Sequence, residues 1–441
     1  MHFAISRNEG IIMQVLLQIA ITLAAGLMLS RFTKKLGLPS VTAYLVAGML
    51  IGPYALGRLG VPGLGFATMD EVKSLGILSD VALGFIAFAI GNEFRLSALK
   101  KTGKQATVIA IVQALAATLF VDGALLVLHI WLRDRLPVPM VLCLGAIATA
   151  TAPAATLMVV RQYKADGPLT RLLLPIVALD DAVGLVVFAV SFGIAKAMLG
   201  GHIDLISIIV NPLLEIVLSL LLGFVMGLLF SAAEKFYDSN SKRLSISITF
   251  VILTVALSQL EFHIGSVKIG FSTLLVCMML ATVFCNICDF SEEIMGRVDK
   301  WTAPLFILFF ALSGAELELN VFTDLTIVGI GVIYILFRSA GKYLGALGSA
   351  KMMRCSEEVC THLGITLLPQ AGVALGMSVT VQTLEGVGPL IRNIVLFGVL
   401  IYELVGPLLT KWSLTQAGEI KPKPPEKTRA AKIAAANADQ K

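Results

Sequence analysis

Two adjacent aspartates, in the segment LDDAVG (179–184), lie in the middle of a long apolar run. A carboxylate inside a bilayer is energetically costly, and the intramembrane acids that do occur generally bind ions or protons. Arg171 marks one end of the run, and Asp180 follows it by about 14 Å on a helix that rises 1.5 Å per residue. Asp180 and Asp181 are therefore predicted to lie near the middle of a membrane.

The two aspartates cannot both face the same partner, because neighbouring residues on a helix point about 100° apart. One of them can pair with a basic side chain while the other faces a water-filled cavity. A carboxylate in such a cavity can exchange a proton for a hard cation, which prefers oxygen ligands. The residues alone leave open which of the two aspartates takes which part.

Three more features are predicted to share this depth. Arg338 lies midway between Asp324 and Lys351 in another apolar run, and Pro153 and Pro369 lie near the middles of two further runs. A mid-helix proline removes a hydrogen bond and leaves a carbonyl free. Two opposed broken helices would bring helix ends to the midplane, where acidic and basic side chains can compensate their partial charges.

Other polar side chains are candidates for lesser parts. The hydroxyls of Thr149 and Thr151 can serve a cation on the first broken helix, and the carbonyl of Gln370 can do so on the second. Lys342, one turn beyond Arg338, is expected to extend toward the cytoplasmic surface in a structural part. Glu93 is expected to be structural or to lie at a cavity mouth. Three further acids in apolar runs are expected to be packing contacts or secondary proton relays: Asp122, Glu215 and Glu403.

The composition fits a protein built around the bilayer. Of the 441 residues, 57% are hydrophobic and 14% are charged, and the mean hydropathy is +0.88. Soluble globular chains carry about 25% charged residues. The composition therefore excludes a soluble enzyme, a nucleic-acid-binding module and a disordered protein.

Apolar runs of a length that can cross a ~30 Å hydrocarbon core recur along the chain. There are thirteen: 11–32, 39–57, 74–96, 105–130, 137–160, 172–197, 205–233, 243–261, 264–287, 301–317, 322–350, 359–383 and 388–411. Lysine and arginine are concentrated in alternate loops and in the segment after the last run. The positive-inside rule then predicts an N-terminus outside and a C-terminus in the cytoplasm.

The domain organisation follows from these runs. Residues 1–10 are predicted to be extracytoplasmic, 11–411 to form the transmembrane domain, and 412–441 to be a short disordered cytoplasmic tail. GNEFRL (91–96) is similar to GAELEL (314–319), and ATATAPAATL (148–157) to GITLLPQAGV (364–373), each pair seven runs apart.

Because seven is odd, the two members of each pair cross the membrane in opposite directions. This spacing predicts an inverted repeat of about 11–199 and 243–411, joined by a connector helix at 205–233. Paired interrupted helices in inverted repeats are typical of secondary transporters.

Four segments resemble the monovalent cation:proton antiporters, in the two-aspartate branch of the sodium/hydrogen exchanger superfamily. They are the early helix LGLPSVTAYLVAGMLIGP (36–53), the two-aspartate motif ALDDAVG (178–184), the broken helix ATATAPAA (148–155) and the basic helix FRSAGKYLG (337–345). The resemblance covers about residues 10–411. It implies an all-α fold of about thirteen transmembrane helices with two crossed broken helices, a mobile core domain and a dimerising scaffold domain.

The resemblance also implies a function. Sodium, or potassium, would be exchanged for protons by alternating access, in a homodimer of the plasma (inner) membrane that needs no cofactor and serves pH homeostasis. By motif position, Asp181 would be the main carrier of cation and proton, and Asp180 would pair with Arg338. Electrogenic relatives usually have lysine where this chain has Arg338, and arginine effectively never deprotonates. Arg338 is therefore not expected to carry a proton.

Three other classes compete with antiport. An intramembrane aspartyl protease takes its two acids from two helices, whereas this pair is adjacent on one helix. A channel has no need of an inverted repeat with a titratable pair. A sodium-coupled symporter of organic solutes is the main alternative. It would need a larger polar or aromatic cavity than these helices offer.

Overall fold

The computed structural model describes residues 7–36, 38–61, 63–92, 94–199, 211–237, 239–264, 267–317 and 325–420. The described chain is almost entirely helical. Its first part contains α1 (Arg7–Lys35), α2 (Ser40–Ile51), α3 (Met69–Ser74), α4 (Gly76–Gly91), α5 (Leu96–Leu132), α6 (Val138–Ile147), α7 (Pro153–Tyr163) and α8 (Pro168–Met198). Its second part contains α9 (Asn211–Glu234), α10 (Asn240–Ser258), α11 (Thr273–Ile287), α12 (Ser291–Glu316), α13 (Leu325–Met352), α14 (Glu357–Thr366), α15 (Gly372–Thr380) and α16 (Gly388–Gln416). Short 3-10 turns lie at Leu56–Leu59, Arg133–Arg135 and Val381–Thr383.

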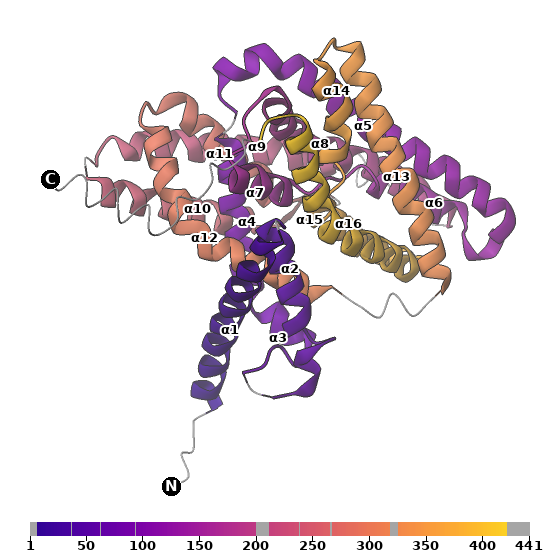
Figure 1. Ribbon diagram of the computed structural model, residues 1–441, viewed down its shortest axis with the longest axis horizontal. Coiled ribbons are helices and arrows are strands. Elements are labelled where there is room, and N and C mark those ends of the chain that lie inside the picture. Colours follow the sequence, from indigo (N-terminus) through magenta and orange to yellow (C-terminus); the bar gives the residue numbers. More distant parts are fainter. Residues whose placement is uncertain are drawn as a thin grey trace, which may run out of the picture.

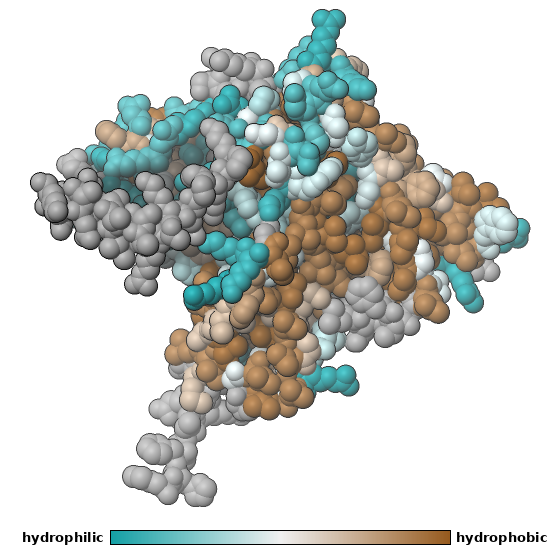
Figure 2. Space-filling view, viewed as in Figure 1, coloured by the Kyte–Doolittle hydropathy of each residue, from teal (hydrophilic) through white to brown (hydrophobic). Residues whose placement is uncertain are grey.

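Within the described residues, nine helices are long and apolar enough to cross a membrane. The shorter α4, α6 and α11 are also apolar. Every apolar run predicted from the sequence contains a helix, while the number of crossings and the inverted repeat remain predictions. In Figure 2, hydrophobic residues gather over α1, α2 and the neighbourhood of α13 and α16, and hydrophilic residues gather around α14. The face seen in Figure 2 therefore has an apolar region of the kind that a bilayer can cover.

The helices pack as two bundles. The first bundle consists of α1, α2, α4 and α9–α12, and the second consists of α5–α8 and α13–α16. Gly48 on α2 lies against the backbone of Ala311 on α12, where any side chain would collide. In the second bundle, α13 runs beside α5 (Figure 1).

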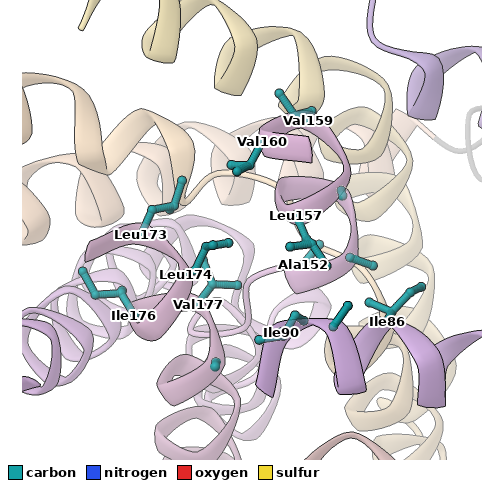
Figure 3. Close-up of a cluster of buried hydrophobic side chains, with 14 of the residues drawn as sticks. Ile86, Ile90, Ala152, Leu157, Val159, Val160, Leu173, Leu174, Ile176 and Val177 are labelled. Atoms are coloured by element: carbon teal, nitrogen blue, oxygen red, sulfur yellow. The ribbon is translucent and has the colours of Figure 1, made fainter. Parts of the chain in front are cut away.

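The bundles meet in a dry apolar layer formed by α4, α7 and α8. Ile86 and Ile90 of the first bundle belong to the same buried apolar cluster as Leu157, Leu173 and Val177 of the second (Figure 3). Because all of these side chains are buried and apolar, this part of the boundary is sealed against water.

The two ends of the molecule can be told apart. At the tail end, α16 finishes beside the last residue of α7, with the Lys411 ammonium 4.9 Å from the centre of the Tyr163 ring. The α3 end carries α3, which packs against α4 and α12. In Figure 1, α3 lies low in the view and α14 high.

The predicted disorder from 412 onward is wrong for residues 412–420. Helix α16 continues to Gln416, and Glu419 folds back as the cap of α8. Its buried carboxylate accepts hydrogen bonds from the backbone of Leu169 (2.6 Å) and Thr170 (2.8 Å) and from the Thr170 hydroxyl (2.6 Å). A carboxylate at a helix N-terminus satisfies free N–H groups and the helix dipole together. Residues 421–441 lie outside the described chain.

Two other boundaries also differ from the prediction. Helix α1 begins at Arg7, inside the segment 1–10 that was expected to precede the membrane domain. The run 264–287 starts inside a small antiparallel hairpin, β1 (Phe262–Ile264) and β2 (Val267–Ile269), so that α11 begins only at Thr273. Alternating β-branched and polar residues explain the hairpin, because this period suits a strand and not a helix.

Candidate functional site

The two predicted helix breaks are present, and they meet. Helix α6 ends at Ile147 and α7 begins with Pro153, while Pro369 lies in the gap between α14 and α15. The backbone N–H of Ala152 donates to the carbonyl of Pro369 over 2.8 Å. Proline at the first position of α7 needs no N–H partner, so it starts a new helix there and is not an ordinary kink.

Gln370 braces this crossing from within. Its amide nitrogen donates to the carbonyl of Ile147 over 2.9 Å and lies 2.8 Å from the hydroxyl oxygen of Tyr334. The Tyr334 hydroxyl in turn lies 3.2 Å from the side-chain carbonyl oxygen of Gln370, to which it can donate. The side-chain carbonyl of Gln370, which was predicted to be available to an ion, thus already has a partner within the protein. Gly406 on α16 packs against the Pro369 ring, which holds the second break at the same place.

Arg338 is completely buried among the broken ends. Its guanidinium donates to the carbonyls of Ala148 (3.0 Å), Ala150 (2.6 Å) and Leu368 (2.8 Å), and it stacks 4.4 Å from the centre of the Tyr402 ring. These carbonyls follow the C-termini of α6 and α14, where the helix dipoles are negative. Arg338 thus lies where a basic side chain can compensate the negative ends of the broken helices.

The predicted pairing of Arg338 with Asp180 is wrong, since Lys342 is the partner. The Lys342 ammonium lies 3.0 Å from Asp180 Oδ2, and it also donates to the Thr149 carbonyl (2.6 Å) and the Thr151 hydroxyl (2.8 Å). All three of its protons are used, and the side chain is fully buried. Lys342 therefore does not extend toward the surface as the sequence analysis expected.

Asp180 is saturated with donors. Oδ2 accepts from Lys342 and from the Thr151 hydroxyl at 2.6 Å, and Oδ1 accepts from the side-chain amide of Gln113 on α5. Thr151, predicted as a cation ligand, is thus committed to the ion pair. Sequence reasoning missed Gln113, although an isolated glutamine within the apolar run 105–130 was the available signal.

Asp181, the next residue, differs from Asp180 in having no donors from the described residues around its carboxylate. It is 1% exposed, and within the described chain neither of its carboxylate oxygens has a hydrogen-bond partner. An unpaired buried carboxylate costs several kcal/mol in its charged form, on the order of the effective desolvation penalty for an ion. Asp181 therefore needs a proton or a cation.

Thr149 is the predicted ligand that stays near Asp181. Its hydroxyl lies against Gly184, one helical turn after Asp181, and donates to the carbonyl of Ala146 over 2.7 Å. The oxygen lone pairs are available to a cation, since its proton is already used. Glu93 lies outside the described residues. No group of three His, Cys, Asp or Glu that could hold a resident metal occurs in the part of the chain that the structure describes.

This geometry can be compared with known proteins. A family profile described as sodium/hydrogen exchanger, transmembrane, matches residues 19–416. The chain belongs to this family. The resemblance drawn from the broken helices and the two-aspartate motif is thereby confirmed.

Relatives in the exchanger family are distant in sequence. Na(+)/H(+) antiporter NhaS4 of Synechocystis is 23% identical over 80% of this chain and 85% of the relative. Cation/H(+) antiporter 19 of Arabidopsis thaliana is 24% identical over 80% of this chain, which spans 44% of that longer protein.

The fold is shared with a solved exchanger. The sodium proton antiporter MjNhaP1 of Methanocaldococcus jannaschii superimposes with a TM-score of 0.68 at 18% identity, over 93% of this chain and 99% of that one. At this identity the likeness concerns the fold, which is that of the sodium/proton antiporters, as the sequence analysis expected.

Proposed function

We propose that this chain exchanges a monovalent cation for protons across a membrane by alternating access, with sodium first and potassium second among the candidates. One observation carries the proposal: Asp181 is buried without a partner, directly beside the Asp180–Lys342 ion pair. A carboxylate in this state binds a proton or a cation, and the two therefore compete for one group.

The ion pair supplies a second exchangeable proton. In the proton-loaded form, Asp181 is neutral and Lys342 is an ammonium paired with Asp180, so the three side chains together carry no net charge. A cation that binds to both aspartates competes with Lys342 for Asp180, and Lys342 then releases its proton. The cation-loaded form carries one negative charge, so we propose two protons per cation and an electrogenic cycle.

The site suits a small ion. Asp180, Asp181 and Lys342 are all at most 1% exposed, and the helix breaks around them are closed by side chains of the protein. An organic solute would need a larger cavity, so the symporter alternative has no support here.

Alternating access would move the two bundles against each other. At the tail end they are clamped: Arg161 on α7 lies 2.6 Å from Asp299 on α12, and Gln162 accepts from the backbone of Ser40 on α2 over 2.7 Å. Beside this clamp lies the apolar layer of Figure 3. These contacts support a cycle in which the tail end closes while the α3 end gives access.

We further propose a homodimer in the plasma (inner) membrane, with the α3 end outside and the tail end in the cytoplasm. The alternation of basic loops supports this orientation. Helix α1 exposes large apolar side chains to lipid or a second copy, including Leu16, Met28 and Phe32.

The test is proton flux in proteoliposomes loaded with an internal pH dye, with sodium, potassium or lithium added in turn. A pH change on cation addition that is absent in Asp181→Asn supports antiport and identifies the ion. If sodium, potassium and lithium all fail to cause proton movement, the proposal is overturned.

A further inference from the structure

Glu403 on α16 is a second buried carboxylate that the proposed exchange does not use. It is 4% exposed, and its Oε2 atom has no hydrogen-bond partner within the described chain. A buried carboxylate with an unpartnered oxygen is unfavourable as a free anion. Like Asp181, it therefore needs a proton or a cation.

Its neighbours along α16 fix its depth. Tyr402 stacks on Arg338, and Gly406, less than one turn further on, packs against Pro369. Glu403 therefore lies at the level of the helix crossing. The Tyr402 hydroxyl donates to the carbonyl of Ile335 on α13, so Glu403, about 100° further round the helix, points away from α13.

Glu403 lies near the boundary between the bundles. Helix α16 packs there against α2 of the first bundle, and the charged group that acts on Glu403 is Glu316, the last residue of α12. Glu316 in turn interacts with Asp80 on α4 and with Lys73 on α3. Glu316 and Asp80 are both exposed near α3, and Glu316 interacts electrostatically with both Asp80 and the buried Glu403.

The negative charges of Asp80, Glu316 and Glu403 suit a path for cations. Exposed carboxylates from α4 and α12 raise the local concentration of cations at the α3 end. A purely structural cluster could be explained by Lys73, which partly neutralises the exposed carboxylates. Lys73 does not explain why a further carboxylate, that of Glu403, is buried at the depth of the site. The Oε2 atom of Glu403, unpartnered within the described chain, can there receive a cation that has shed part of its hydration shell.

We propose that Glu403 is a second, transient binding site for the transported monovalent cation, supplied from Asp80 and Glu316 at the α3 end. This proposal rests on the exchange function proposed above. It makes Glu403 a group that contacts the cargo before Asp181 does, and it places the access path along the boundary between α16 and the first bundle.

The first experiment measures exchange kinetics in proteoliposomes for the wild type, Glu403→Gln, Glu403→Asp and the matched control Glu385→Gln. Glu385 is an exposed carboxylate in the turn before α16. We expect about a tenfold rise in the cation KM for Glu403→Gln, with a maximal rate within about a factor of two of wild type. Glu403→Asp should recover most of the affinity, and the control should match wild type.

The second experiment measures equilibrium binding of radioactive sodium to the purified protein, which does not depend on transport. Asp181→Asn lacks the main site and should retain weak binding, and Asp181→Asn combined with Glu403→Gln should lose it. Equal residual binding in these two variants, or an unchanged KM in Glu403→Gln, overturns the second site. Failure of the exchange function itself would instead appear as absent proton flux in the wild type.

Discussion

Lys342 and Asp180 form a fully buried ion pair, with Nζ and Oδ2 3.0 Å apart and neither side chain exposed. The residue beside this pair, Asp181, has no partner. Thus one helix of the second bundle holds a compensated and an uncompensated carboxylate in consecutive positions. The two aspartates should accordingly respond to mutation in opposite ways.

Substitution of Asp181 by Asn is expected to abolish cation-dependent proton flux while leaving the protein as stable as wild type or more so. The variant removes a buried carboxyl group that has no hydrogen-bond partner in the described chain. Asp180→Asn, in contrast, leaves the Lys342 ammonium unpaired and should cost about 3–5 kcal/mol. Thermal unfolding in detergent, compared between the two variants, measures the contrast. Equal destabilisation by both would mean that Asp181 has a partner in the folded protein.

Replacement of Lys342 by Arg separates charge from proton release. Arginine can keep the ion pair with Asp180 but does not deprotonate. We expect cation-dependent proton flux that is slower and no longer accelerated by a membrane potential. Currents on a solid-supported membrane check this. A wild-type current in Lys342→Arg would show that Lys342 does not carry the second proton.

Arg338→Lys is expected to weaken the fold more than it changes ion selectivity. A lysine ammonium cannot span the three carbonyls of Ala148, Ala150 and Leu368 as the guanidinium fork does. If lysine keeps one of the three charge-assisted hydrogen bonds, the loss of the other two at about 1.5 kcal/mol each should cost about 3 kcal/mol. Denaturation of the purified variant measures it, and sodium-to-potassium preference in the same preparation provides the control.

Loss of the Arg161–Asp299 pair should shift the balance between the two access states of the transport cycle and should change the stability of the fold only slightly. Its side chains are 22% and 39% exposed, and such pairs contribute at most about 1 kcal/mol. Asp299→Ala is therefore expected to change the ratio of the cation KM values measured from the two membrane faces by about twofold to fivefold. The exchanged pair Arg161→Asp with Asp299→Arg should restore the ratio. A ratio that is altered equally in the single and the exchanged variants would contradict a clamp.

Much of this architecture follows from the order of residues along the chain. Long apolar runs mark the helices, and Pro153 and Pro369 mark the breaks, because proline and hydrophobic length act locally. The adjacent aspartates similarly indicate the transport helix without knowledge of its neighbours. These features depend on segments of about twenty residues, which a sequence displays directly.

The partner of Asp180 could not be predicted in this way. Arg338 and Lys342 are four residues apart and share one face of α13, so both are candidates for any acid opposite that face. The choice depends on how far α13 is displaced along α5 and α8, and close packing such as that of Gly341 on Ala117 sets this displacement. The pairing of Gln113 with Asp180 depends on the same displacement. The anchoring of Glu419 was missed because its binding partner, the first turn of α8, is about 250 residues away.

The contact between Glu419 and α8 has a practical consequence for handling this protein. Residues 417–420 form the clasp that joins α16 to the helix bearing Asp180 and Asp181. An expression clone that stops at the predicted end of the membrane domain, residue 411, would omit the clasp together with the last turn of α16. Fluorescent reporters or affinity tags are better joined well beyond residue 420, so that their bulk does not pull on the transport helix.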